Sequence, residues 1–233
     1  MYLFYSDHSR IFKNKLVLGE EEARHAIRVL RHKTGDIISV TDGEGSLYEA
    51  VITNINQQTV TAEIMNIKNY PPDNPQLTLA IGIVKKRDRL EFAIEKCVEL
   101  GINKILIYRG DHSEKTGVRE ARIHRIILRA MKQSLRFHLP KAVIKNSLED
   151  ALDSENFTGI IAADETKKRV KTANVNVSGH HLLVIGPEGG YSESERRLLS
   201  SFNADKISLG KHRLRTETAA IVMTARYRQL TAS

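Results

Sequence analysis

The sequence predicts an α/β protein in which a small β-rich domain precedes a larger domain with a mostly parallel sheet. Three observations lead to this prediction. Residues 1–70 contain short β-rich runs separated by turn signals, residues 71–76 belong to a proline-rich linker, and residues 77–233 alternate apolar runs with helical stretches. Strands that alternate with helices are typical of a parallel sheet covered on both faces. The predicted boundaries are therefore 1–70, 71–76 and 77–233.

The first domain is predicted to combine one short helix with a small antiparallel barrel. Apolar spacing predicts the helix over residues 20–32. Turn signals at 42–45 and 56–58 separate the β-rich runs. These runs occupy residues 35–40, 46–55 and 59–67.

The second domain is predicted to follow a strand–helix order throughout. The expected strands are 77–84, 104–108, 159–163, 181–186 and 206–210, and the expected helices are 87–100, 118–135, 193–202 and 216–230. Gly101 is placed to end the first of these helices. Ser192 and Glu195 have the S-x-x-E spacing of a capping box, which marks the start of another.

Composition excludes several classes of protein. No apolar run is long enough to span a bilayer and the N-terminus lacks the order of a signal peptide, so we expect a soluble, cytoplasmic protein. The single cysteine, Cys97, occupies an apolar helical position, which excludes disulfides and a cysteine-based zinc site. The net charge is +8, and Lys115 to Lys145 hold nine Lys/Arg against Glu120 alone. This block favours a polyanionic partner.

Two loops have the character of a ligand site. The stretch LLVIGPEGGYSESE, residues 182–195, places three glycines and Pro187 directly after a strand, where open α/β sheets bind ligands. It matches neither a P-loop nor G-x-G-x-x-G, and a tight turn without a ligand stays an alternative. The stretch ISLGKHRLRTETAA, residues 207–220, repeats the arrangement with Gly210 and a basic cluster, which makes two unrelated turns a weaker explanation.

At these two stretches the sequence resembles the ribosomal RNA small-subunit (uracil-N3)-methyltransferase family, RsmE-like, within the SPOUT superfamily. HAIRVLRHKTGDIISVTDGEGSLYEA is similar to the family's N-terminal PUA-like RNA-binding barrel, KKRDRLEFAIEKCVELGI to its first catalytic helix, and QSLRFHLP to its Gln-Ser-x-Arg-x-x-x-Pro stretch. The chain departs from many relatives at Lys132 and Leu135, where they carry an acid and a glycine.

The resemblance implies a fold, a cofactor and an assembly. It implies a trefoil knot in the C-terminal domain, S-adenosylmethionine as cofactor, a homodimer, and small-subunit ribosomal RNA as substrate. The residues themselves indicate no metal site. The residues implied to bind the cofactor are Gly186, Pro187, Glu188, Gly189, Gly190, Leu209, Gly210, Leu214 and Arg215. The glycines would let backbone amides approach the cofactor closely.

The catalytic residues expected on this basis are Arg215 and Glu217. The N3 of uracil carries a proton at neutral pH, so the enzyme must supply a base or stabilise the anion. Arg215 is expected to hold the developing negative charge, and Glu217 to orient Arg215 or to compensate the helix dipole. His212 is the alternative, as a general base.

Three basic groups are the expected RNA contacts. One is a helical stripe of Arg122, Arg125, Arg129, Lys132 and Arg136, whose members have no carboxylate between them. The others are Lys85, Lys86, Arg87 and Arg89 in the second domain, and His25, Arg28, Arg31 and His32 in the first. His180 and His181 have no carboxylate at ligand spacing and are expected to be structural.

Two other functions remain open from the sequence. One is a non-catalytic RNA-binding factor of ribosome assembly that has the same fold and a dead pocket. The other is a nucleotide-dependent oxidoreductase, which is disfavoured because no early G-x-G-x-x-G follows the first strand.

Overall fold

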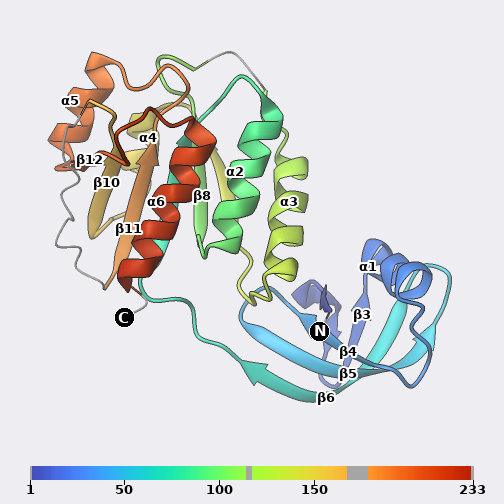
Figure 1. The fold of residues 1–233 in the computed structure, drawn as a ribbon. Coiled ribbons are helices and arrows are strands. Elements are labelled where there is room, and N and C mark those ends of the chain that lie inside the picture. Colours follow the sequence, from blue (N-terminus) through green and yellow to red (C-terminus); the bar gives the residue numbers. More distant parts are fainter. Residues whose placement is uncertain (1, 114–116, 167–177, 232–233) are drawn as a thin grey trace. The chain divides into compact units, whose positions relative to one another are not determined.

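The computed structural model describes residues 2–113, 117–166 and 178–231, which form two compact units (Figure 1). The first unit contains Met1–Pro72 and Met131–Leu139, and the second contains Asp73–Ala130 and Pro140–Ser233. The residues 131–139 were predicted in the second domain. They join the first unit through backbone hydrogen bonds, from Gly45 N to Phe137 O (3.0 Å) and from Leu139 N to Gly43 O (2.8 Å).

The sheet of the first unit is a curled half-barrel with open edges. Its strand order is β1 (Leu3–Tyr5), β4 (Ile37–Thr41), β5 (Ser46–Ile55), β6 (Val60–Asn69), β3 (Lys15–Leu18) and β2 (Ile11–Phe12). The two predicted turns and the three predicted strands β4 to β6 are confirmed. The predicted small antiparallel barrel takes the form of a half-barrel, in which β1 and β2 are edge strands and β1 pairs parallel with β4.

The helix of the first unit is shorter than predicted. A short turn at η1 (His8–Arg10) precedes it, and the helix itself consists of α1 (Glu20–Arg24) and a π-helical turn, η2 (His25–Val29). Arg31 adopts a left-handed backbone conformation, with φ of 58°, and this ends the helix. The predicted continuation to His32 is therefore wrong.

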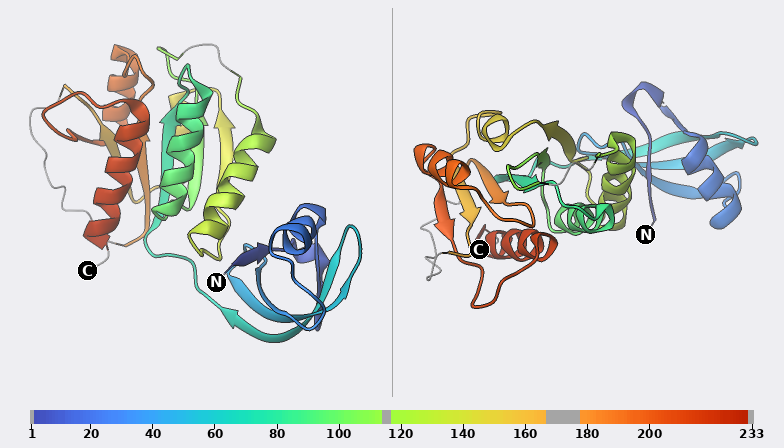
Figure 2. Two further views of the ribbon diagram at one scale, coloured as in Figure 1. Left: turned by 45° about the vertical axis from the view of Figure 1, so that its right-hand side comes forward. Right: turned by 90° about the horizontal axis from the view of Figure 1, so that it is seen from above.

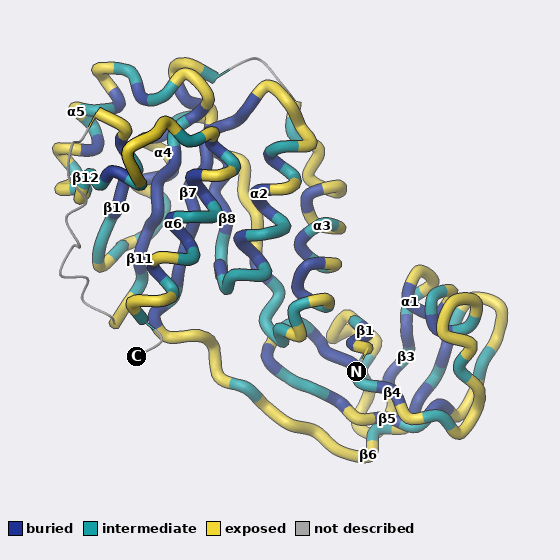
Figure 3. The backbone as a smooth tube through the Cα atoms, in the orientation of Figure 1, coloured by how far each residue is buried: buried dark blue, intermediate teal, exposed yellow. Residues whose placement is uncertain are grey.

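The second unit contains a six-stranded, fully parallel sheet, as the alternating pattern predicts. Its strand order is β12 (Asp205–Ile207), β10 (Gly159–Ala163), β11 (His180–Ile185), β7 (Gln76–Gly82), β8 (Lys104–Tyr108) and β9 (Lys141–Lys145). The central strands β7 and β11 are buried along almost their whole length (Figure 3). Apolar side chains on both faces of these strands form the core.

Helices cover both faces of this sheet (Figures 1 and 2). On one face lie α4 (Leu148–Leu152) and α5 (Glu193–Ser201), whose apolar residues pack on those of β8, β10 and β11. On the other face lie α2 (Arg87–Glu99), α3 (Glu120–Gln133) and α6 (Thr216–Thr231). Gly101, with φ of 99°, follows the end of α2, and the Ser192–Glu195 capping box opens α5, both as predicted. Within the described ranges, no helix is both long and apolar enough to cross a membrane.

Candidate active site

The second unit contains a cavity of about 590 Å³ where strands β10, β11 and β12 end. Its walls are the two loops that the sequence singled out, residues 185–191 and residues 208–216, together with residues 163–165 and the start of α6. Parallel strands bring their carboxyl ends to one edge of the sheet, so segments distant in sequence meet there.

Eight of the nine residues predicted to bind a cofactor line this cavity, and Gly189 does not. A Cβ on Gly189 would lie 2.7 Å from the Cβ of His112, so this glycine permits close packing between loops. Gly190 has φ of 70°, which only glycine adopts readily. A Cβ on Gly210 would meet nothing within 4 Å, so this position faces open space beside the cavity.

The glycine loop is fixed where it leaves β11. Two buried tyrosines donate to the last carbonyls of this strand, Tyr191 Oη to Val184 O (2.9 Å) and Tyr108 Oη to Ile185 O (3.1 Å). Burial raises the pKa of both phenols, which keeps them protonated as donors. A Cβ on Gly82 would lie 2.5 Å from Pro187 N, so β7 and the loop approach each other at van der Waals distance.

A segment after β8, residues 109–113, braces the same loop from outside. His112 Nδ1 lies 3.2 Å from Gly189 O and 3.3 Å from Gly190 O, and can only donate to these carbonyls. The Asp111 carboxylate accepts from the hydroxyls of Ser192 and Ser194, and these hydrogen bonds lower its pKa. Neither residue was predicted to belong to the site, although both follow a predicted strand whose end lies at this edge.

Asp164, on the opposite wall of the cavity, was also missed. It follows β10, is only 4% exposed, and forms an ion pair with Arg196 of α5. Burial alone would raise its pKa, but the hydrogen bonds from Arg196 and Thr166 outweigh this and hold the pKa below the ordinary 3.8. The ionised carboxylate thus joins β10 to α5 at the edge of the cavity.

The two predicted catalytic residues occupy different places. Arg215 is exposed and lines the cavity. Glu217 does not line it, and its Oε1 lies 3.6 Å from Nε of Arg89, which also donates to Glu188 (3.0 Å). The carboxylate therefore faces Arg89 instead of the expected Arg215. Its Oε2 is buried without a hydrogen-bond partner among the described residues.

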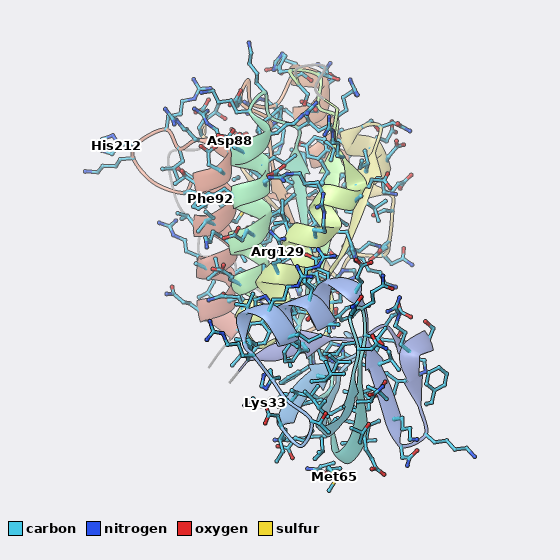
Figure 4. The ribbon with its side chains drawn as sticks, turned by 90° about the vertical axis from the view of Figure 1, so that its right-hand side faces the viewer. Lys33, Met65, Asp88, Phe92, Arg129 and His212 are labelled. Atoms are coloured by element: carbon cyan, nitrogen blue, oxygen red, sulfur yellow. The ribbon has the colours of Figure 1, made fainter. Side chains whose placement is uncertain are left out.

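The loop before α6 lies at the surface. His212, the alternative base, lines the outer part of the cavity and sits on a protruding segment of this loop (Figure 4). Arg213 crosses from this loop to both other walls, with its Nε 3.1 Å from Glu165 Oε2 and its Nη2 donating to Glu188 O (3.3 Å).

The basic stripe on α3 is less unbalanced than the sequence indicates. Arg122 donates two hydrogen bonds to Glu91 of α2 (2.6 and 2.7 Å), and Lys132 forms an ion pair with Glu22. Arg125 and Arg129 are exposed, whereas Arg136 lies beyond the end of the helix. The sequence shows that no carboxylate lies between the members of the stripe, but it does not show the carboxylates that α1 and α2 supply. Lys115 lies outside the described residues.

The remaining predicted RNA contacts are mostly exposed. Lys85 and Lys86 before α2 and Arg87 at its start are exposed, and Arg28 and Arg31 are exposed in the first unit. His25 stacks on Tyr2, with ring centroids 4.8 Å apart. His32 Nδ1 contacts Asp36 (3.1 Å), so one nitrogen of its ring is engaged within the first unit.

Both adjacent histidines at the start of β11 contact polar atoms of neighbouring residues. His180 Nε2 contacts Thr78 Oγ1 (2.7 Å), and His181 Nε2 contacts Ser178 O (3.0 Å). Among the residues that the structure describes, no group of His, Cys, Asp and Glu could hold a metal ion.

The fold and the cavity define an RNA methyltransferase. A family model described as "RNA methyltransferase domain" matches residues 72–228, and one described as "RNA methyltransferase PUA domain" matches residues 18–65. A curated relative, "Ribosomal RNA small subunit methyltransferase E" of Rickettsia conorii, is 30% identical over 95% of this chain and 93% of its own length. The chain belongs to the ribosomal RNA small subunit methyltransferase E family.

Solved structures show the same arrangement of elements. A probable rRNA-methyltransferase from Porphyromonas gingivalis is 31% identical, with a TM-score of 0.90 over 100% of this chain and 99% of that chain. A ribosomal RNA small subunit methyltransferase E from Neisseria gonorrhoeae, solved bound to S-adenosyl methionine, is 28% identical, with a TM-score of 0.86 over 99% and 98%. These matches overturn the oxidoreductase alternative.

Proposed function

We propose that this protein transfers a methyl group from S-adenosylmethionine to N3 of a uridine in small-subunit ribosomal RNA. The observation that supports this most strongly is that two loops, about twenty residues apart in the sequence, line the same cavity. Both loops belong to the segment that the RNA methyltransferase family model matches.

The cavity suits S-adenosylmethionine in size and chemistry. Its volume of about 590 Å³ falls in the range of about 300 to 1,000 Å³ typical of small-molecule sites. The open space at Gly210 would take a ligand that presses against the backbone, which a larger side chain would obstruct. Partly buried Leu209 and Leu214 would contact the adenine, and Gly186 and Gly190 would present their backbone to the ligand. When bound, the cofactor supplies an electrophilic methyl group.

Arg215 is the residue proposed to assist the loss of the uracil N3 proton. Its guanidinium stays protonated and presents a fixed fork of donors, which suits the carbonyl oxygens that carry the negative charge of the uracil anion. Its exposure leaves these donors accessible to an incoming base. Glu217 has a positioning role instead, because its carboxylate lies against Arg89 at the start of α2.

Exposed cations provide the proposed RNA surface. Arg125 and Arg129 on α3 and Lys85, Lys86 and Arg87 before α2 would contact phosphates, together with Arg28 and Arg31 of the PUA domain. The homodimer and the trefoil knot stay predictions, and light scattering of the purified protein tests the former.

Transfer of tritium from labelled S-adenosylmethionine into isolated small-subunit ribosomal RNA or small subunits tests the function. We expect the wild-type protein to label the RNA and Arg215→Ala to lose far more of the single-turnover rate than of the cofactor affinity. The rate should keep rising with pH through the neutral range. Retention of RNA and cofactor without transfer would favour the binding-factor alternative. A rate that levels off near pH ~6.5, together with an inactive His212→Ala, would indicate a histidine base.

A further inference from the structure

A second, smaller cavity of about 240 Å³ lies in the same unit, where β7 ends. Its walls come from three places: the residues after β7, the first two turns of α2, and residues 117–123 at the start of α3. No residue of the larger cavity lines it. It is therefore a separate site at the same edge of the sheet.

This cavity combines an apolar floor with a cationic rim. The floor consists of Ile83, Val84, Leu90 and Ile123, each 3% or 4% exposed. The rim carries three exposed guanidinium groups, those of Arg87, Arg119 and Arg122. A ligand that fits must therefore present an apolar surface at one end and negative charge at the other.

The cavity is also lined by the carboxylate of Glu91, which is already paired with an arginine. It accepts two hydrogen bonds from Arg122, at 2.6 and 2.7 Å, in a bidentate pair. Among the described residues, neither Arg87 nor Arg119 has a carboxylate partner. These two guanidinium groups therefore leave the rim positively charged, whereas the Arg122–Glu91 pair is close to neutral.

The position of the cavity connects it to the larger one. The first turn of α2 borders both, because Arg89 lines the larger cavity while Arg87 and Leu90 line the smaller one. A chain of nucleotides that places one base at the larger cavity would thus bring a neighbouring nucleotide to the smaller one. Its volume of about 240 Å³ lies below the range of about 300 to 1,000 Å³ typical of small-molecule sites, which favours a ligand as small as one base.

We propose that this cavity binds one nucleotide of the RNA substrate beside the methylated one, with the base on the apolar floor and its phosphate between Arg87 and Arg119. The inference rests on the proposed function, since it requires an RNA substrate. Apolar burial of the base carries no sequence code, so the site holds the RNA in register and the larger cavity selects the base.

Two substitutions separate the phosphate contact from the base contact. Arg119→Ala removes one cation from the rim. Gly117→Leu adds volume to the wall, where a Cβ would meet only Arg87 Nη2, at 4.0 Å, and the backbone has no positive φ. Arg197→Ala, an exposed arginine of α5 outside both cavities, is the matched control.

Affinity for a fluorescent single-stranded fragment of small-subunit ribosomal RNA is measured by anisotropy over a series of salt concentrations. Arg119→Ala should lower the log–log salt slope by about 0.7, the value for one lost phosphate contact on a single strand. Gly117→Leu should keep the slope but weaken binding at least about fivefold, because a base displaced from the floor would lose about 40 Å² or more of apolar burial, at about 25 cal/mol per Å². All three variants should bind S-adenosylmethionine like the wild type, which also confirms that they fold.

Wild-type slope and affinity in both Arg119→Ala and Gly117→Leu would overturn this inference. A reduced slope in Arg119→Ala with unchanged affinity in Gly117→Leu would also overturn it, because phosphate contact would then occur without a bound base. Methyl transfer by the wild-type protein is measured in parallel. If that transfer fails, the proposed function is wrong; if it proceeds while the variants behave like the control, only the second cavity is misassigned.

Discussion

At the scale of single residues, the glycines in and beside the two loops serve different structural purposes. Gly82 and Gly189 permit close packing, since a Cβ would collide with Pro187 or His112, whereas Gly190 permits a left-handed backbone. A valine at Gly189 would strike His112 instead of entering the cavity. Gly210 is the position where a side chain has open space.

Gly210→Leu is therefore expected to abolish S-adenosylmethionine binding with little loss of stability. The added side chain occupies cavity space and meets no atom within 4 Å of its Cβ. Calorimetric titration measures the affinity, and thermal unfolding gives the control for folding. Wild-type affinity in a folded Gly210→Leu protein would remove this loop from the cofactor site.

Asp164 should make the stability of the second unit depend on acid pH. Its folded-state pKa lies below the ordinary 3.8, so its ion pair with Arg196 contributes stability that is fully present above that value. This stability is lost as the pH falls below 3.8 and through the folded-state pKa. Urea unfolding of the wild type and of Asp164→Asn should differ most above pH ~5 and converge in acid. A stability difference between the two proteins that does not change with pH would show that the charge of Asp164 does not stabilise the fold.

At the scale of elements, α6 is anchored near its C-terminal end by Arg228. The guanidinium donates to Pro75 O (3.2 Å), to Gly101 O and to Asn103 Oδ1 (3.0 Å), which lie where β7 and β8 begin. Burial lowers the pKa of Arg228, although Asp73 partly offsets this effect. The arginine thus joins the helix that walls the cavity to the far end of the sheet.

Arg228→Leu should lower the free energy of unfolding by about 2 to 4 kcal/mol, because it leaves three partly buried oxygen acceptors without their donor. Arg226→Ala, an exposed arginine one half-turn away on the same helix, should change stability by less than about 0.5 kcal/mol. Chemical denaturation compares the two variants. Equal effects would show that the buried network of Arg228 contributes nothing specific.

Most elements of the second unit were predictable, because their strands are buried and their helices are amphipathic. The exceptions are β9 and α4. The first four residues of β9, including Val143 and Ile144, are exposed at the sheet edge, and α4 has only five residues, so neither shows the expected periodicity. The two glycine loops were recognisable because each is continuous in sequence. Asp164 and His112 were missed because they act across loops that follow other strands.

At the scale of the whole molecule, two units share one chain that crosses between them more than once. The segment 131–139 returns from the end of α3 to the first unit, where His138 Nε2 contacts Tyr70 O (2.9 Å) and Phe137 stacks on Tyr70. The sequence placed the domain boundary at the proline-rich linker alone. It could not show that residues 131–139 join the first unit, since the contacts connect residues more than sixty positions apart. The QSLRFHLP stretch therefore has a structural role in the PUA domain, beside any contact with RNA.

The central claim is that the cavity between the two loops serves methyl transfer to N3 of uridine in small-subunit ribosomal RNA. The most direct test is to react the wild-type protein with S-adenosylmethionine and this RNA, digest the RNA to nucleosides, and identify the methylated nucleoside by mass spectrometry against standards. The account predicts 3-methyluridine as the product, and its loss in Gly210→Leu. A ribose-methylated nucleoside, a methylated base other than uracil, or transfer that persists in Gly210→Leu would contradict it.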